Sequence, residues 1–266
     1  MKEGGQPDRE QSRTIWSVRC VAMSISRIVP VAALAIACAR QAVVTAAPPR
    51  ASVPSRQLPN DIRWFSTAAE YRALARQTFQ AAGDRLPELA ADFSTGSWAV
   101  ILDADETILD NSEYERRRFA VDSGYTEATW VAWVNERAAQ PIPGATEFTR
   151  RVHALGGRVV IVTNRAASLC DATRVNLAAI AVTADAVLCQ PPGETDKNPR
   201  FQRVQTGTAV QGLPPLNIVE WLGDNILDFP GLTQAARNDP KALAEFGTRY
   251  FILPNPMYGS WQQNQP

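Results

Sequence analysis

Two aspartates one residue apart, Asp103 and Asp105, have the clearest capacity for chemistry in this chain. They follow an apolar run, 97–102, that reads as a buried strand, so both carboxylates should reach one edge of a sheet. A carboxylate can attack phosphorus as a nucleophile, and a second carboxylate beside it can donate and accept protons. Taken alone, Asp-x-Asp-x-Thr107 is also compatible with a helix cap or an Asx turn, so the other polar groups must decide.

Three later strand-like runs also end in polar residues. In chain order these residues are Thr163 and Asn164, then Lys197, then Asp224 and Asp228. Ligands bind outside the carboxyl ends of the strands in an open α/β sheet. The sequence therefore predicts that these groups meet the two aspartates at one site.

Such a site fits phosphoryl transfer. Two anions repel when Asp103 attacks a phosphate, so a hard cation is needed, and Mg²⁺ suits a site of oxygen ligands with Asp103 and Asp224 as the natural pair. Lys197 would neutralise charge on the phosphoryl oxygens, and the Thr163 hydroxyl would orient them. Asp105 would protonate the leaving alcohol and later deprotonate water.

Each later group also has a plainer explanation when it is taken alone. A single lysine such as Lys197 is usually a solvated surface charge, and Gly223-Asp-Asn225 also reads as a turn. The combination, in this order and each at the end of a strand, favours a catalytic site.

The elements that would position these residues alternate along the chain. Five runs are expected to be strands: 97–102, 158–163, 186–189, 217–222 and 249–253. Helical patterns separate most of them, which predicts an α/β fold with a doubly wound, mostly parallel sheet. A helix is expected to begin near Thr67, where Thr67-x-x-Glu70 has the form of a capping box. An insert at 112–144, with a helix around 129–136, lies where a cap over the strand ends would lie.

The charge balance argues against binding to nucleic-acid polymers. Lys and Arg total 27, Asp and Glu total 27, and one histidine leaves the net charge near zero, so no basic footprint is present. A small substrate is expected instead. The lone His153 lies on a predicted helix and is expected to be structural. Because the chain has only this one histidine, phosphohydrolase chemistry built on several histidines is excluded.

The first sixty residues have the composition of an export signal and a linker. The apolar run 28–39 is too short to span a bilayer and follows Arg27, which is typical of a signal peptide ending near 38. The polar segment before it is long for such a signal, so translation from Met23 is expected. Residues 39–60, rich in Ala, Pro and Ser, read as a flexible tether before a domain at 61–262.

Cys38 follows Ala35-Ile-Ala37 and is similar to the lipidated cysteine of a bacterial lipoprotein box, although Leu34 lies one place too early. Ordinary cleavage stays open, because small residues at 35–37 and 45–47 suit a signal peptidase. Either route predicts an exported protein, periplasmic or anchored in the outer membrane through its N-terminus alone. An oxidising compartment would permit a disulfide between Cys170 and Cys189, and two separate buried thiols are the alternative.

The four polar groups occur in the order of the haloacid-dehalogenase-like (HAD) phosphohydrolases. The chain resembles one family of that superfamily more narrowly, the class C or lipoprotein-type acid phosphatases, also called the 5′-nucleotidase family. The stretches that carry this resemblance are Ile101–Tyr114, Pro143–Ala145, Val162–Arg165 and Leu253–Gly259. The resemblance covers residues 60–262.

The resemblance implies a bacterial, exported, Mg²⁺-dependent phosphomonoesterase that acts on 5′-nucleotides and aryl phosphates through an aspartyl-phosphate. By motif, Asp103 is the nucleophile and Asp105 the general acid and base, which also gives a backbone carbonyl to the metal. Asp224 completes the protein ligands of the metal, and Thr107 and Asp228 support them from behind.

The family's aromatic clamp maps onto Trp130 and Tyr258, with Asn164 also implied at the substrate. Stacking is worth about 1–3 kcal/mol per base and selects no particular base. The alternative is that Trp130 and Trp133 are both core residues of the insert. The short tail after Trp261 leaves open whether the family's C-terminal extension, and the homodimer contact it would make, is present.

Two other functions remain compatible with the sequence. A HAD-type sugar phosphatase or phosphotransferase would keep the chemistry and change the substrate. A non-catalytic surface lipoprotein that binds a ligand is of another class, and the intact set of four motifs argues against it.

Overall fold

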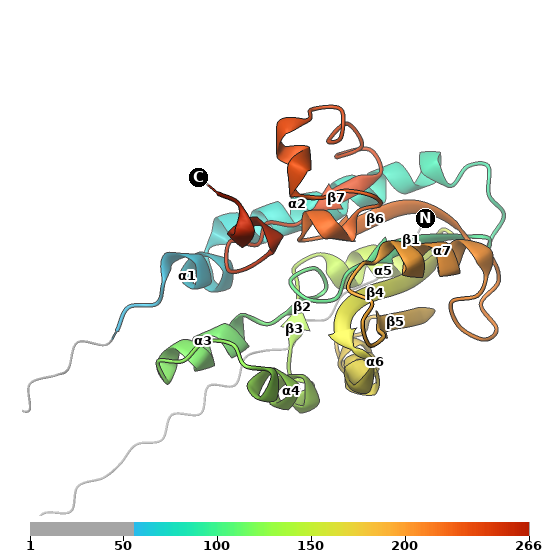
Figure 1. Ribbon diagram of the computed structural model, residues 1–266. Helices are drawn as coiled ribbons and strands as arrows, with labels where there is room; N and C mark the ends of the chain where they lie inside the picture. The colour runs from blue at the N-terminus through green and yellow to red at the C-terminus, as the bar shows by residue number, and fades with distance from the viewer. Residues whose placement is uncertain (1–55, 266) are drawn as a thin grey trace, which may run out of the picture. The chain divides into compact units, whose positions relative to one another are not determined.

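The computed structural model describes residues 56–265 (Figure 1). The predicted signal peptide at 1–38, with Met23 and Cys38, and most of the predicted tether lie outside the described residues. Within 56–265, no helix is both long and apolar enough to cross a membrane.

A five-stranded parallel sheet is the centre of the structure, and its strands are the five predicted from the sequence. In spatial order they are β5 (Ala186–Gln190), β4 (Arg158–Ala166), β1 (Trp98–Leu102), β6 (Asn217–Gly223) and β7 (Tyr250–Ile252). All neighbouring strands pair in parallel. All five residues of β1 are buried, as expected for the middle strand of a sheet covered on both faces. The prediction of a doubly wound α/β sheet is confirmed.

Two hydrophobic cores, one on each face of the sheet, follow from the alternation of side chains along β1. Val100 and Leu102 face the core made with α1 (Asn60–Thr67), α2 (Ala69–Leu89), α5 (Ala145–Ala154) and α6 (Cys170–Ala179). Ala99 and Ile101 face the core made with α7 (Asn198–Thr206) and the segment around Phe229. The chain adds β4 and β5 on one side of β1, then β6 and β7 on the other, which creates a switch point between β1 and β6.

A helix, α2, begins near Thr67 as predicted, but the predicted capping box at Thr67 is wrong. Thr67 is the last residue of α1, and its hydroxyl donates to the carbonyl of Arg63 one turn earlier, so it caps nothing that follows. The backbone turns at Ala68, which is extended and whose side chain makes no capping hydrogen bond, and α2 begins at Ala69.

The insert at 112–144 forms two helices, α3 (Ser112–Ala120) and α4 (Glu127–Glu136), where one was predicted (Figure 1, green). Thr126 caps α4 by accepting from the N–H of Thr129, which begins the helix two residues before the predicted start. A two-residue antiparallel pair, β2 (Leu109–Asp110) and β3 (Gln140–Pro141), closes the base of the insert. Helix α4 packs against η1 (Ala167–Leu169), which directly follows β4, so the insert lies near a carboxyl end of the sheet.

A disulfide joins Cys170, the first residue of α6, to Cys189 near the end of β5. Of the two alternatives left open by the sequence, the structure has the bridge. Three short 3-10 helices complete the described chain: η2 (Ile226–Asp228), η3 (Gln234–Asn238) and η4 (Ser260–Gln263).

Candidate active site

The predicted site residues meet at the carboxyl ends of the strands, around a cavity of about 570 Å³. Those that line it are Asp103, Asp105, Trp130, Asn164, Lys197, Asp224, Asp228 and Tyr258. Asp103 directly follows β1 and Asp224 directly follows β6, so the two carboxylates flank the switch point of the sheet.

Thr163 and Thr107 do not line this cavity. Thr163 is fully buried in β4, and its hydroxyl oxygen accepts a hydrogen bond from the N–H of Arg165. Thr107, also fully buried, donates to Asp224 Oδ1 at 3.3 Å. Thr107 therefore contacts a cavity carboxylate from behind. Its predicted role in supporting the metal ligands, and the predicted contact of Thr163 with a phosphoryl group, stay predictions.

Lys197 bridges two carboxylates at the bottom of the cavity. Its ammonium contacts Asp103 Oδ1 and donates to Asp228 Oδ1 at 2.7 Å, and its side chain is only 5% exposed. Burial raises the pKa of Asp103 to about 7, because it disfavours the charged form more than Lys197 favours it. Burial also disfavours the ammonium, but Asp103 and Asp228 outweigh it and raise the pKa of Lys197. Lys197 is thus a buried cation, and the surface-charge explanation is excluded.

Three carboxylates crowd this end of the cavity. Asp103, Asp224 and Asp228 can each offer an oxygen within 4.8 Å of the others. Asp224 is further held by Asn255, whose Nδ2 donates to Oδ2 at 2.8 Å. Burial, together with the Asp228 and Asp103 charges, raises the pKa of Asp224 well above its usual range.

The donor set of this cluster fits a divalent cation. The buried Asp103 and Asp228 share one ammonium, and the half-buried Asp224 adds a third carboxylate beside them. Negative charge is therefore left uncompensated, which is costly away from water unless it is paired. All the side-chain ligand atoms are oxygens, which hard cations prefer. Asp228, predicted only to support the ligands, is one of the three.

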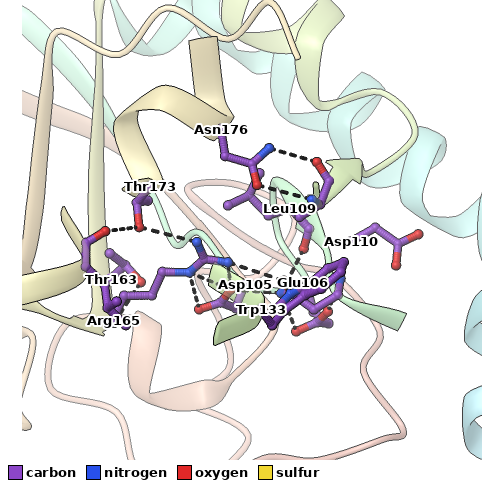
Figure 2. Close-up of polar contacts among 12 residues, drawn as sticks. Asp105, Glu106, Leu109, Asp110, Trp133, Thr163, Arg165, Thr173 and Asn176 are labelled. Carbon is purple, nitrogen blue, oxygen red and sulfur yellow. Dashed lines mark hydrogen bonds and ion pairs between the residues drawn. The ribbon is translucent and has the colours of Figure 1, made fainter. Parts of the chain in front are cut away.

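Asp105 is held by residues that the sequence analysis did not identify. Arg165 Nη2 donates to Asp105 Oδ1 at 2.7 Å (Figure 2). Asn111 Nδ2 donates to the same oxygen at 2.8 Å. Arg165 belongs to the Val162–Arg165 stretch that carried the resemblance, and Asn111 belongs to the Ile101–Tyr114 stretch. Both residues therefore lie in stretches that resemble the family, but the sequence alone assigned no function to either of them.

Asn164 is tied to the loop that carries Lys197. Its Oδ1 accepts from Arg200 Nη2 at 2.5 Å, and its Nδ2 donates to the carbonyl of Thr195 at 3.0 Å. Arg200, which is 1% exposed, also donates to the carbonyl of Thr163 at 2.6 Å. This missed arginine therefore fixes the end of β4 against the loop before α7.

Aromatic side chains form the outer wall of the cavity. Trp130 is partly exposed and lines the cavity, whereas Trp133 is 3% exposed and packs in the core. Tyr258 lines the cavity from the C-terminal segment. Tyr114 and Tyr125, which were not predicted, also line it, and the Tyr114 ring meets the Trp130 ring edge-on at 5.2 Å.

A parallel doubly wound sheet, with an aspartate pair after its central strand and a lysine and further aspartates at the neighbouring strand ends, defines a phosphohydrolase of the HAD superfamily. Comparison with known families makes the assignment narrower. Residues 26–261 match the family described as HAD superfamily, subfamily IIIB (acid phosphatase), and the chain belongs to this family of class C acid phosphatases. It is a phosphomonoesterase that acts on small-molecule phosphates.

Solved structures of class C acid phosphatases are similar to this chain in both sequence and fold. The class C acid phosphatase from Bacillus anthracis is 30% identical in sequence, with a TM-score of 0.67, over 76% of this chain and 85% of that chain. The same enzyme with tungstate bound is 31% identical with a TM-score of 0.66, over the same shares of the two chains. The resemblance read from the sequence is confirmed at the level of family, fold and enzyme class.

Proposed function

We propose that this acid phosphatase hydrolyses 5′-nucleotides and aryl phosphates through a phospho-Asp103 intermediate, with Mg²⁺ as its metal. The observation that carries the proposal is the buried Lys197 ammonium between Asp103 and Asp228, in a cavity whose outer wall is aromatic. Lys197 supplies positive charge for a phosphoryl group, and the aromatic wall supplies flat faces for a leaving group.

In the first step, an oxygen of Asp103 forms a bond to phosphorus while the ester P–O bond breaks. The electron pair of that bond leaves with the ester oxygen, and Asp105 transfers its proton to it, so a neutral alcohol departs. Lys197, 2.7 Å from Asp228 and in contact with Asp103, offsets the charge on the phosphoryl oxygens.

In the second step, a water molecule attacks the phospho-aspartate and Asp105 takes its proton. The bond between Asp103 and phosphorus breaks, and its electron pair returns to the carboxylate, which releases inorganic phosphate. Asp105 is then protonated again for the next cycle.

The residues that would hold Mg²⁺ are Asp103, Asp224 and the backbone carbonyl of Asp105, with Asp228 beside them. When bound, the ion supplies positive charge that lets one anion approach another. The cluster of three carboxylates supports this assignment. That the relative from Bacillus anthracis binds tungstate, an oxyanion, also supports an oxyanion site here.

Substitution of Asp103 tests the intermediate. Asp103→Asn keeps the shape of the side chain but removes the nucleophile, so turnover should fall by at least about 10³-fold. Mass spectrometry of acid-quenched wild-type enzyme should find one phosphate on the peptide that contains Asp103. Undiminished turnover in the variant, or full activity after exhaustive chelation, would contradict the proposal.

The preference for nucleotides rests on the aromatic wall. Trp130→Ala should lower kcat/KM for a nucleoside monophosphate about tenfold, since one stacked ring contributes about 1–3 kcal/mol. The same change should lower kcat/KM for a sugar phosphate much less, because a sugar has no flat ring to stack on Trp130. An equal effect on both substrates would favour the alternative, a sugar phosphatase or phosphotransferase with the same chemistry.

We also propose export to the periplasm, or to the outer membrane through a lipid on Cys38. The disulfide between Cys170 and Cys189 supports an oxidising compartment. Fractionation of cells that express the full chain should place the protein with membranes, and Cys38→Ser should release it to the soluble periplasm. Recovery of the wild-type protein from the cytoplasm would contradict export. The homodimer stays a prediction, which light scattering of the purified protein tests.

A further inference from the structure

The two oxygens of the Asp105 carboxylate have different surroundings (Figure 2). Oδ1 accepts three hydrogen bonds, from Arg165 Nη2 at 2.7 Å, Arg165 Nε at 3.0 Å and Asn111 Nδ2 at 2.8 Å. Oδ2 has one longer contact, with Arg165 Nε at 3.2 Å. The contacts therefore distinguish the two oxygens of a carboxylate that lines the active-site cavity.

Arg165 is fixed on all sides of its guanidinium. Its side chain is 1% exposed, and its Nη1 donates to the hydroxyl of Thr173 on α6 at 3.3 Å. Its backbone N–H donates to Thr163, and the Trp130 ring lies 5.4 Å from its guanidinium carbon. A buried guanidinium anchored in this way cannot follow the carboxylate, so the carboxylate must follow it.

The side chain of Asn111 is also held in place, in part by Trp133 on helix α4 of the insert. Its Oδ1 accepts from Trp133 Nε1 at 2.8 Å and from Arg165 Nη2 at 3.2 Å, and its backbone N–H donates to Glu106 Oε1 at 2.8 Å. Its amide nitrogen is therefore directed at Asp105 and cannot flip without losing these bonds. Helix α4 thus touches both holders of Asp105, through Trp130 and Trp133.

We propose that Arg165 is a positioning residue that, together with Asn111, keeps Asp105 Oδ1 as a hydrogen-bond acceptor and leaves Oδ2 to carry the proton. The inference rests on the proposed role of Asp105 in the phosphatase reaction. An arginine and an amide NH₂ can only donate, so a proton on Oδ1 would face donors on every side. Oδ2 can carry the proton, give it to the ester oxygen as the P–O bond breaks, and take one from the water that attacks next.

Leaving groups that differ in basicity test this inference. A nucleoside 5′-alkoxide is a strong base that must be protonated as it leaves, whereas p-nitrophenolate is stable without a proton. Arg165→Lys keeps the positive charge but loses the planar fork. We expect kcat/KM for a nucleoside monophosphate to fall by about 30-fold or more, toward the full contribution of a general acid of about 10²–10⁴. The value for p-nitrophenyl phosphate should fall less than about threefold.

Three further variants make the outcome decisive. Trp133→Phe removes the donor to Asn111 together with part of the ring that packs in the core, and it should give the same selective loss on a smaller scale. This variant decides the question if Arg165→Lys does not fold by circular dichroism. Arg151→Lys makes the same chemical change on the exposed face of α5 and should alter neither substrate. Asp105→Asn should show the largest selective loss.

The results separate this inference from the proposed function. If Asp105→Asn affects both substrates equally, the proposed role of Asp105 fails and the inference fails with it. If Asp105→Asn is selective but Arg165→Lys and Trp133→Phe lower both substrates equally, Arg165 only supports the fold and the inference alone is overturned. Selective loss in Asp105→Asn, Arg165→Lys and Trp133→Phe supports both the proposed role of Asp105 and the inference about Arg165.

Discussion

At the scale of single residues, Asp103 and Asp105 stand two positions apart, yet a different cation contacts each. Lys197 reaches Asp103 from the loop before α7, and Arg165 reaches Asp105 from the end of β4. An ammonium acts as a compact charge, while a guanidinium fork also fixes orientation. The partners therefore match the proposed roles, since a nucleophile needs its charge offset and a proton donor needs its direction held.

Glu220 is a buried carboxyl in β6 that the proposed reaction does not use. Both of its oxygens lack a hydrogen-bond partner within residues 56–265, and burial raises its pKa to about 9, with Arg85 opposing. Between the unfolded pKa of roughly 4.3 and the folded pKa, the unfolded chain releases a proton that the folded chain keeps, so stability is lost as pH rises. At about 1.4 kcal/mol per pH unit, this costs roughly 4 kcal/mol at pH 7.

Glu220→Gln removes this titration, so the variant should be more stable than the wild type by about 4 kcal/mol at pH 7 and about equally stable near pH 4.5. Urea unfolding of both proteins across this range measures the difference. Glu147→Gln, on an exposed position of α5, serves as the control and should show no such trend. A difference between wild type and Glu220→Gln that is independent of pH would mean that Glu220 keeps its charge in the folded protein.

A site residue could be predicted from the sequence where a local pattern, such as the end of a strand, marks its position. Asp103, Asp224 and Lys197 could be found, because each follows a run that reads as a strand and strand ends meet at one edge. The partnership of Arg165 with Asp105 joins residues 60 positions apart and depends on side-chain packing that no local pattern records. Arg200 was missed for the same reason.

At the scale of elements, the strands were predicted and the helix boundaries less well. A strand buried on both faces is a continuous apolar run, which is visible in the sequence. Thr67 has the pattern of a cap, but a threonine in the last turn of a helix can bond backward instead, and the packing of α1 decides between the two. Strands of two residues, such as β2 and β3, carry no periodicity at all.

The disulfide joins the start of α6 to the end of β5, close to two segments that carry active-site residues. Cys170 begins α6 directly after β4 and η1, and Cys189 lies in β5 just before the loop to Lys197. The bridge closes a loop of 19 positions, so its removal should cost about 3 kcal/mol of stability. The double variant Cys170→Ala with Cys189→Ala should show this loss in urea unfolding, and wild-type protein unfolded in the presence of a reductant should match it.

The bridge itself is checked by a non-reducing peptide map. The peptides that contain Cys170 and Cys189 should run as one species and separate after reduction. Recovery of both cysteines as alkylated free thiols from unreduced protein would contradict the bridge, and a reductant would then leave the stability unchanged.

At the scale of the whole molecule, the active-site charges oppose folding until a cation joins them. Asp103, Asp228 and the half-buried Asp224 lie close together, with the Lys197 ammonium in contact with Asp103 and Asp228. Their mutual repulsion is part of the free energy of the folded state. The unfolded chain has no such cluster. An ion that binds only the folded protein therefore stabilises it by mass action, by about 2.7 kcal/mol at one hundred times its dissociation constant.

Asp224→Asn should consequently change stability in opposite directions with and without metal. In EDTA the variant should melt at a higher temperature than the wild type, because one repelling charge is gone and Asn255 can still contact the side chain. With excess Mg²⁺ the wild type should gain stability and overtake the variant, which has lost a ligand. Asp171→Asn, at an exposed aspartate on α6, should follow the wild type in both conditions. A Mg²⁺-dependent rise in Tm that persists in Asp224→Asn would place the metal elsewhere, and no rise in the wild type would remove the metal from the proposed mechanism.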